Sequence, residues 1–432
     1  MNRMNERISV GVAVLILLVF SSLPAAAQAP QDSGLTHSLT PVVLFPGWGG
    51  TRLEVRVLNQ TVAPECPISG TFEYTFFPAQ PSTEFSQMCE DKLLTLVYDF
   101  DPQKSTGTKG KPAWRISEQP GVQVSVLDYG KTESSPLYEP LYAFLEQAGY
   151  QRNVNIRVAG YDLRLTPDMG GFMERTTELI EETYRENDHT PVHLVGHSNG
   201  PLYAQYLLTH TSQQWKNKYI HGFTPIAGNW PGQGWLYVLL FAGFDVPTAS
   251  YPTDPANAAT SAAMYASHPS TYMSASDPTY FGDREVVIQV GPGGKEYTPQ
   301  DAQQLFKDAG LQVSQKIAPY YFGFVEFRPP FFPYVDVYAE KGSGLPTVVG
   351  VQLPDLTVGQ VLGDAPVWIM RNGDSNQEDI TNDAVLVWQA MSCYHFEFHD
   401  NPGVDHLSLA LATPAVWERL LTHLQQPMSK CR

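Results

Sequence analysis

A tight turn between an apolar strand and a helix constrains this chain more than any other feature. The turn reads Gly-His-Ser-Asn-Gly at residues 196–200, and it follows the apolar run 192–195. An amphipathic helix is expected after Ser198, with Pro201 suited to its first turn. The glycines let the strand turn sharply, which exposes the serine hydroxyl while the helix N-terminus faces developing negative charge. Ser198 is therefore predicted to be a nucleophile.

Strands and helices alternate on both sides of this turn. The expected strands are residues 42–45, 154–159, 192–195, 223–227, 367–370 and 394–398, and the expected helices are 137–148, 172–184, one after Ser198 and one opened by Thr413 and Pro414. This alternation predicts an α/β fold with a mostly parallel sheet flanked by helices.

The alternation stops for a long stretch in the second half of the chain. Residues 229–364 are rich in Pro, Gly, Ser and aromatic side chains. We interpret this stretch as an inserted cap. The core is then expected to consist of residues 28–228 and 365–432.

A serine hydroxyl is a weak nucleophile near neutral pH, so Ser198 needs a base, and the base needs an orienting carboxylate. His406 follows the last expected strand through a turn-forming segment, which places it in a loop beyond the sheet. His395 falls within the strand and His423 on the side of the last helix expected to be exposed, so both are read as structural. His399 remains an alternative. His406 is predicted to be the base.

Three aspartates follow the expected strand 367–370 and are candidates for the carboxylate. Asp383 precedes a small-then-apolar run, the pattern expected where a loop carboxylate re-enters packed structure. Asp374 follows Asn and Gly, which is typical of a turn. The sequence favours Asp383, with Asp374 and Asp379 as alternatives.

Acyl-transfer chemistry also needs two backbone N–H groups to stabilise an oxyanion. One is expected from Asn199, the residue after the nucleophile. The other is expected from the glycine-rich loop 46–50 after the first strand, where the N–H of Trp48 is our choice. This loop could instead be only a tight turn.

The first 27 residues have the features of a signal peptide. A short charged segment precedes the uncharged apolar run 8–20, and an Ala-rich stretch with small residues suited to cleavage follows. The apolar run is short for a bilayer span, so an uncleaved anchor is the lesser alternative. The mature chain is expected to be soluble and exported.

The four cysteines are Cys66, Cys89, Cys393 and Cys431, an even number in a chain expected to enter an oxidising compartment. Two disulfides have three possible pairings, of which Cys66 with Cys89 and Cys393 with Cys431 is favoured. No Cys/His cluster has the spacing of a metal site, so no metal is expected.

The formal net charge of −17 argues against nucleic acid as a partner. It also argues against docking on anionic membranes by charge alone. Any contact with lipid is therefore expected to depend on apolar surface.

Six segments together resemble the lecithin:cholesterol acyltransferase family, which includes lysosomal phospholipase/acyltransferases and phospholipid:diacylglycerol acyltransferases. The similarity spans most of the mature chain and is more specific than the serine turn alone. The segments are PVVLFPGWGGTRLEV from Pro41, PGVQVSVLDYGKT from Pro120, AGYDLRLTP from Ala159, PVHLVGHSNG from Pro191, QQWKNKYIHGF from Gln213 and PGVDHLSL from Pro402. The resemblance implies an α/β-hydrolase fold with Ser198, Asp383 and His406 as the catalytic triad.

The resemblance also implies a lid closed by Cys66 and Cys89, over residues 66–89. Its aromatic residues either contact lipid or pack on the body of the enzyme; they are Phe72, Tyr74, Phe76, Phe77 and Phe85. The aromatic-rich region 317–338 either lines an acyl tunnel or, as we favour, forms the core of the cap.

Three departures from the family pattern stand out. The acid motif reads Asp-Ala-Val-Leu from Asp383, the segment 227–232 replaces a Gly-Ala-Pro-Trp-Gly-Gly pattern, and Met370 stands where a partner for Cys393 is expected. The first departure bears most directly on the choice of carboxylate.

The family's activity implies a secreted or lumenal enzyme, with lysosome or vacuole included. Such an enzyme transfers an acyl group from a glycerophospholipid through Ser198 to a sterol or other lipid alcohol, or to water, without a cofactor. Its expected partners are phospholipid, a lipid acceptor and, transiently, a membrane or lipoprotein surface. The alternatives are a plain phospholipase or lipase, and a catalytically silent lipid-binding protein.

Overall fold

A central parallel sheet organises the chain in the computed structural model, which describes residues 39–75, 82, 84–100, 114–244, 250–391, 393–429 and 431. The expected signal peptide, residues 1–27, lies outside the described residues. The sheet has six strands in the order β15-β12-β9-β8-β1-β7, and all neighbours are parallel. Its strands are β1 (Val42–Phe45), β7 (Ile156–Val158), β8 (Val192–His197), β9 (Ile220–Ile226), β12 (Val337–Ser343) and β15 (Phe396–Pro402).

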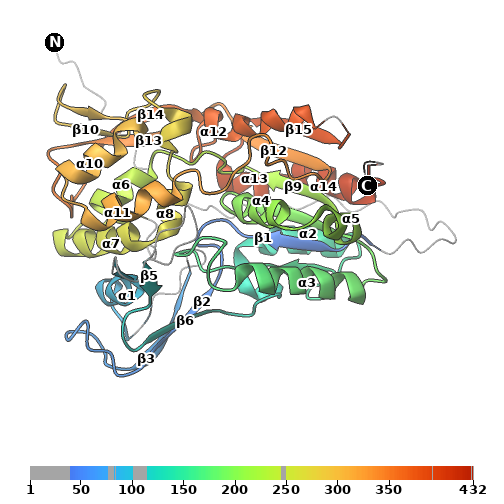
Figure 1. Ribbon diagram of the computed structural model, residues 1–432, viewed down its shortest axis with the longest axis horizontal. Helices are drawn as coiled ribbons and strands as arrows, with labels where there is room; N and C mark the ends of the chain where they lie inside the picture. The colour runs from blue at the N-terminus through green and yellow to red at the C-terminus, as the bar shows by residue number, and fades with distance from the viewer. Residues whose placement is uncertain are drawn as a thin grey trace, which may run out of the picture.

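Helices cover both faces of this sheet (Figure 1). One face packs against α3 (Phe172–Glu186), α4 (Gly200–His210) and α5 (Gln213–Tyr219). The other face packs against α2 (Glu139–Gln147), α13 (His406–Leu411) and α14 (Pro414–Gln425). Because helices exclude water from both faces, the residues of β1, β8, β9 and β12 are all buried. The predicted α/β-hydrolase architecture is confirmed.

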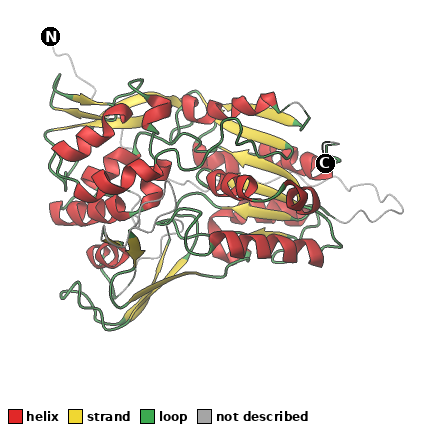
Figure 2. Cartoon of the chain, in the orientation of Figure 1, coloured by secondary structure: helices red, strands yellow, loops and turns green. Residues whose placement is uncertain are grey.

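A second layer of structure lies at one end of the central sheet (Figures 1 and 2). Its sheet has the order β11-β10-β13-β14. The strands are β10 (Ile288–Val290), β11 (Glu296–Tyr297), β13 (Leu345–Leu353) and β14 (Val367–Gly373). The helices are α6 (Leu236–Ala242), α7 (Pro255–Ser267), α8 (Pro269–Ser274), α9 (Pro278–Phe281), α10 (Ala302–Asp308), α11 (Gln312–Tyr321) and α12 (Asp379–Asp383). All of these elements except β14 and α12 come from residues 229–364, the stretch interpreted from the sequence as a cap, and the layer is called the cap below.

The predicted bounds of the cap, residues 229–364, need two corrections. β12 lies inside this range yet belongs to the central sheet, and β14 lies outside it yet pairs with β13 in the cap. β12 was not predicted as a strand of the central sheet, because Glu340 and Lys341 interrupt its apolar pattern. Both residues are nevertheless buried, each in an ion pair. The apolar start of β14 resembled a core strand, but its side chains are largely exposed or half-buried.

The lid region forms a third unit. Strands β2 (Leu53–Val57), β3 (Gly70–Tyr74) and β6 (Val122–Val126) make one small sheet, and β4 (Val97–Asp99) and β5 (Arg115–Ser117) pair beside α1 (Gln87–Leu94). Both predicted disulfides, Cys66–Cys89 and Cys393–Cys431, are present. The lid aromatics Phe72, Tyr74 and Phe85 are buried and pack on the body, whereas Phe76 and Phe77 lie outside the described residues.

The helices of the described segments are short. Among them, none combines the length and the apolar character that crossing a membrane would require.

Candidate active site

Ser198 occupies a strained turn where β8 ends and α4 begins. Its φ angle is 60°, a left-handed conformation that non-glycine residues rarely adopt. The flanking glycines are required by space, because a Cβ on Gly200 would lie 2.0 Å from the carbonyl oxygen of Phe45, and one on Gly196 2.8 Å from the nitrogen of Pro201. Ser198 itself is half-buried, whereas its neighbours His197 and Asn199 are buried. This is the geometry of a nucleophile elbow.

His406 is held by a buried aspartate, Asp374. Its Nδ1–H donates to Oδ2 of Asp374 at 3.0 Å, and its backbone N–H donates to the carbonyl oxygen of Asp374 at 2.8 Å. The Asp374 carboxylate is fully buried and its second oxygen accepts from the backbone N–H of Asn376 at 3.0 Å and of Gln377 at 2.6 Å. The ring is therefore fixed in one tautomer, with Nε2 left as the basic atom.

The carboxylate at His406 is thus Asp374 and not Asp383, which corrects the sequence prediction. Asp383 lies at the end of α12, where its carboxylate accepts from Lys341 Nζ at 2.5 Å, and Asp379 lies 3.5 Å from the same ammonium. The turn signature around Asp374 was read correctly. That turn is what aims the carboxylate, because Oδ1 binds the turn amides and Oδ2 stays directed at the imidazole.

Electrostatics keep Asp374 ionised. Burial raises the pKa of its carboxyl, but the neighbouring charge and hydrogen bond of His406 and the two turn amides lower that pKa by more, so the net shift is downward. A carboxylate in this state can stabilise the imidazolium that forms when His406 accepts a proton.

His197 links the nucleophile turn to the loop after β1. It is buried, and burial is the main cause that lowers its pKa to about 3, so its ring is neutral. Its Nε2 faces the carbonyl oxygen of His406 at 3.0 Å and must carry the proton, so Nδ1 accepts from the Tyr138 hydroxyl at 2.9 Å. The same hydroxyl oxygen accepts from the Gly47 N–H at 2.8 Å. His197 and Tyr138 thus connect the nucleophile turn to the loop after β1, a link between residues 59 positions apart that the sequence does not reveal.

Two tyrosines fix the expected oxyanion loop. The Pro46 carbonyl accepts from the Tyr161 hydroxyl at 2.7 Å, and the Gly47 N–H of the same peptide binds Tyr138. The next peptide is fixed by its own carbonyl, which accepts from the Gly50 N–H at 2.9 Å. Because the two ends of a trans peptide point in opposite directions, this turn sets the direction of the Trp48 N–H. Trp48 and Asn199 as oxyanion donors stay predictions.

The loop also lies close to the nucleophile. A Cβ on Gly47 would be 3.1 Å from Cβ of Ser198, so only glycine permits this approach without displacement. Asn199 is buried, and its side-chain oxygen accepts from the Ser274 hydroxyl at 2.8 Å. The cap therefore supports the residue that follows the nucleophile.

Tyr138→Phe tests this arrangement. Removing the hydroxyl leaves the Gly47 N–H and the His197 Nδ1 without their buried partner, so we expect a loss of about 1–3 kcal/mol in the free energy of unfolding, measured by urea denaturation. Tyr142→Phe is the matched control, because the Tyr142 hydroxyl is also buried but binds only the Ser135 carbonyl. If both variants lost the same negligible amount of unfolding free energy, the Tyr138 hydroxyl would not be a stabilising link between Gly47 and His197.

The other histidines considered from the sequence gather elsewhere. His395, His399 and His423 all face Glu397 rather than Asp374. His423 is buried, contrary to the expectation that it lies on the exposed side of its helix. These histidines are therefore not part of the arrangement at Ser198.

Sequence comparisons identify relatives across most of the chain. A family model described as lecithin:cholesterol acyltransferase matches residues 84–257. The chain is 27% identical to lecithin-cholesterol acyltransferase-like 1 of Arabidopsis thaliana, covering 74% of this chain and 75% of that protein. It is 25% identical to phosphatidylcholine-sterol acyltransferase of Gallus gallus, covering 87% and 88%. It is 27% identical to lysosomal phospholipase A and acyltransferase of Mus musculus, covering 85% and 87%.

A solved structure supports the fold alone. The Tle4-Tli4 complex contains a chain that matches 90% of this chain and 99% of its own length, with a TM-score of 0.52 at 12% identity. The family model, the relatives and the architecture agree. In sequence the chain is similar to the lecithin:cholesterol acyltransferase family, and it has the fold that this resemblance implies.

Proposed function

We propose that this chain is a serine-dependent lipid O-acyltransferase and phospholipase, acting through Ser198, His406 and Asp374. One observation carries the proposal: a buried carboxylate fixes the tautomer of His406, whose backbone carbonyl is bonded to the residue before the strained Ser198. The names of the relatives, which pair phospholipase A with acyltransferase and phosphatidylcholine with sterol, support the substrate class.

The proposed reaction proceeds through an acyl-enzyme. Nε2 of His406 accepts the proton of the Ser198 hydroxyl as its oxygen attacks the ester carbonyl of a glycerophospholipid. The oxyanion is stabilised by the N–H groups of Asn199 and Trp48. The imidazolium then returns the proton to the departing lysophospholipid alkoxide, and a second alcohol or water attacks the acyl-enzyme with His406 again as base. No cofactor is needed for any of these steps.

An apolar cavity offers space for an acyl chain. Its volume is about 550 Å3, and segment 165–170 after β7 and aromatic residues of α11 form parts of its wall. The parallel strands bring this segment to the same edge of the sheet as the turn of Ser198. Of the aromatic region 317–338, Tyr321 is buried among the cap helices, which supports the cap-core interpretation, whereas Phe327 is buried in the core around the central sheet. Tyr320, Tyr321 and Phe324 also line the cavity.

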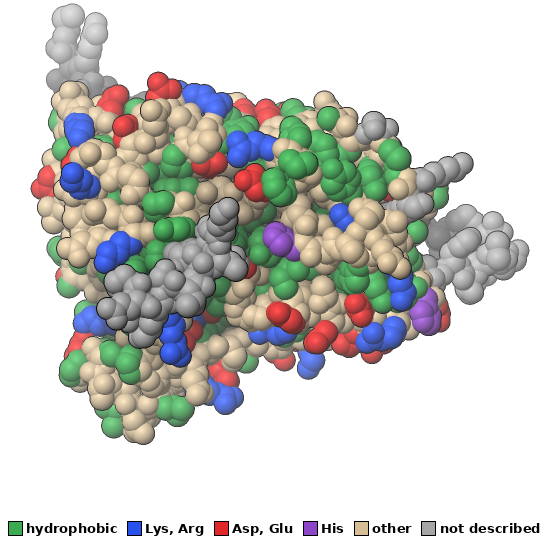
Figure 3. All heavy atoms as spheres, in the orientation of Figure 1, with side chains coloured by type: hydrophobic (Ala, Val, Ile, Leu, Met, Phe, Trp, Pro, Cys, Tyr) green, Lys and Arg blue, Asp and Glu red, His purple; other side chains and the backbone are tan. Residues whose placement is uncertain are grey.

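Apolar surface is available for contact with a lipid interface. In the lid region Leu58, Val62 and Ile68 are 52%, 39% and 63% exposed. On the face drawn in Figure 3, hydrophobic side chains gather between dispersed acidic and basic ones. We propose transient contact with membrane or lipoprotein through such surface, and a secreted or lumenal location, which the two disulfides support.

The acyl acceptor distinguishes the proposal from its alternatives. Liposomes of acyl-labelled phosphatidylcholine should be incubated with the enzyme, with and without sterol, diacylglycerol or a ceramide analogue. We expect labelled ester of one acceptor to form at the expense of labelled fatty acid, because an alcohol and water compete for the same acyl-enzyme. Labelled fatty acid alone would favour a plain phospholipase. Absence of any acyl release, with no labelling of Ser198 by a fluorophosphonate, would favour a silent lipid-binding protein.

A further inference from the structure

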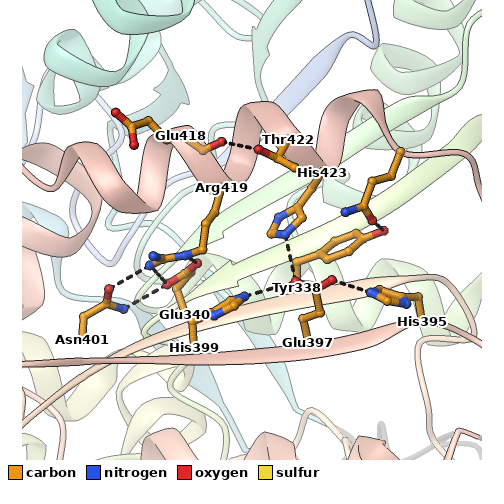
Figure 4. A network of polar contacts seen from close by, with 11 residues as sticks. Tyr338, Glu340, His395, Glu397, His399, Asn401, Glu418, Arg419, Thr422 and His423 are labelled. Carbon is orange, nitrogen blue, oxygen red and sulfur yellow. Dashed lines mark hydrogen bonds and ion pairs between the residues drawn. The ribbon is translucent and has the colours of Figure 1, made fainter.

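A second cluster of reactive side chains lies on the far edge of the central sheet. His395 directly precedes the edge strand β15, and Glu397 and His399 lie within it. The three residues alternate along extended backbone, so their side chains point to the same face. His423 reaches them from α14, and Figure 4 shows all four side chains directed at one another. None of the contacts made by this cluster includes Ser198, His406 or Asp374.

The ligand-type atoms converge on one carboxylate. Nε2 of His399 lies 3.1 Å and Nε2 of His423 lies 3.2 Å from the same oxygen of Glu397, Oε2. One ligand atom from each of the three residues lies within 4.8 Å of the others. Ligand atoms about 2.0–2.2 Å from a tetrahedral Zn2+ are separated by about 3.3–3.5 Å. The two nitrogen–oxygen separations are close to that spacing, so small side-chain rotations would form the site.

The residue types of the cluster suit zinc. Carboxylate oxygens and imidazole nitrogens both bind Zn2+, and the coordination does not require a thiolate.

The surrounding groups orient the candidate ligands, and among the described residues no neighbouring lysine or arginine cation occupies the Glu397 carboxylate in place of a metal. His395 Nε2 lies 2.5 Å from the other oxygen of Glu397, Oε1, and so orients the carboxylate. The Tyr338 ring stacks on His423 with ring centroids 3.9 Å apart. The nearby cation Arg419 is engaged by the buried Glu340, so its charge is already compensated.

The elements that carry the ligands are tied together covalently. Cys393 precedes β15 and Cys431 follows α14, and the two form a disulfide. This bond limits how far the strand and the helix can separate, which lowers the entropic cost of assembling a site between them. A metal at this point would clamp α14 onto the strand that leads into the His406 loop.

We propose that Glu397, His399 and His423 form a Zn2+ site, with the fourth position open to water beside the partly exposed His399. The sequence predicts no metal, because no Cys/His cluster in it has the close spacing of a metal site. His423 lies 26 residues beyond Glu397 and is brought to it only by the packing of α14. Within the local sequence, the alternation His-x-Glu-x-His at residues 395–399 was the feature that could have indicated such a site.

The test measures zinc binding by the full-length protein after removal of metal with a chelator. Isothermal titration with ZnSO4 is expected to give one saturable site in the wild type. His399→Gln should weaken binding by more than about 100-fold, the upper end of the effect of losing an outer partner. His399 is partly exposed, so this variant should fold. Glu397→Gln is a second variant that keeps most of the hydrogen bonds.

A control separates this cluster from other histidines. His210→Gln removes an exposed imidazole at the end of α4, outside the cluster, and should leave the zinc affinity unchanged. Zinc should also raise the melting temperature of the wild type and of His210→Gln, but not that of His399→Gln. The proposal is overturned if the wild type binds no zinc, or if His399→Gln and Glu397→Gln bind it as tightly as the wild type.

Discussion

Ser198→Ala is expected to lower kcat for acyl release from phosphatidylcholine by about 10^6-fold, the loss seen when a serine nucleophile is removed from a triad. The reason is chemical, since alanine offers no oxygen to form the acyl-enzyme while the Asp374–His406 pair and the oxyanion loop remain. The measurement is the initial rate of release of labelled fatty acid from liposomes. Circular dichroism and thermal melting should show that the variant is folded.

Covalent labelling provides a second measure of the same variant. A fluorophosphonate should label the wild type at Ser198 and should not label Ser198→Ala. Ser125→Ala, which removes an exposed serine hydroxyl in β6, is the matched control and should be labelled and active like the wild type. Retention of more than a tenth of the wild-type rate in Ser198→Ala would show that another group is the nucleophile.

Asp374→Asn is expected to lower kcat by about 10^4-fold, because an amide in place of the carboxylate favours the wrong tautomer of His406 and cannot stabilise its imidazolium. Asp383→Asn is expected to keep kcat within a few-fold of the wild type. Asp383 is 41% exposed and is paired with Lys341, so its loss removes only a partly solvated ion pair. The same liposome assay measures both variants.

The two aspartate variants form a matched pair, because each replaces one carboxylate by its amide within the segment after β14. A large loss in Asp383→Asn together with a small loss in Asp374→Asn would contradict the assignment made from the geometry. Thermal melting of both variants would distinguish loss of chemistry from loss of folded protein.

The local part of the site could be predicted from the sequence. The turn at Ser198 is encoded by neighbouring residues, because the two glycines meet steric limits set by the chain on either side of it. The position of His406 after the last strand is also a local feature. Both could therefore be placed before the structure was known.

The carboxylate could not be placed in the same way. Asp374 follows β14, whose position depends on antiparallel pairing with β13, and neither its turn sequence nor its distance from His406 along the chain reveals that pairing. Its burial depends on contacts made across the fold. The same holds for His197, whose partner Tyr138 lies 59 residues earlier in the chain.

The origin of Asp374 has a consequence for how this architecture can vary. β14 belongs to the sheet of the cap, so the carboxylate that orients His406 follows a cap strand rather than one of the parallel strands of the central sheet. The cap therefore cannot be removed without also removing the carboxylate that orients His406. A chimera that exchanged this layer with that of another protein would also exchange the carboxylate that orients His406. Loops of the cap could therefore diverge only where they leave the path from β13 to Asp374 intact.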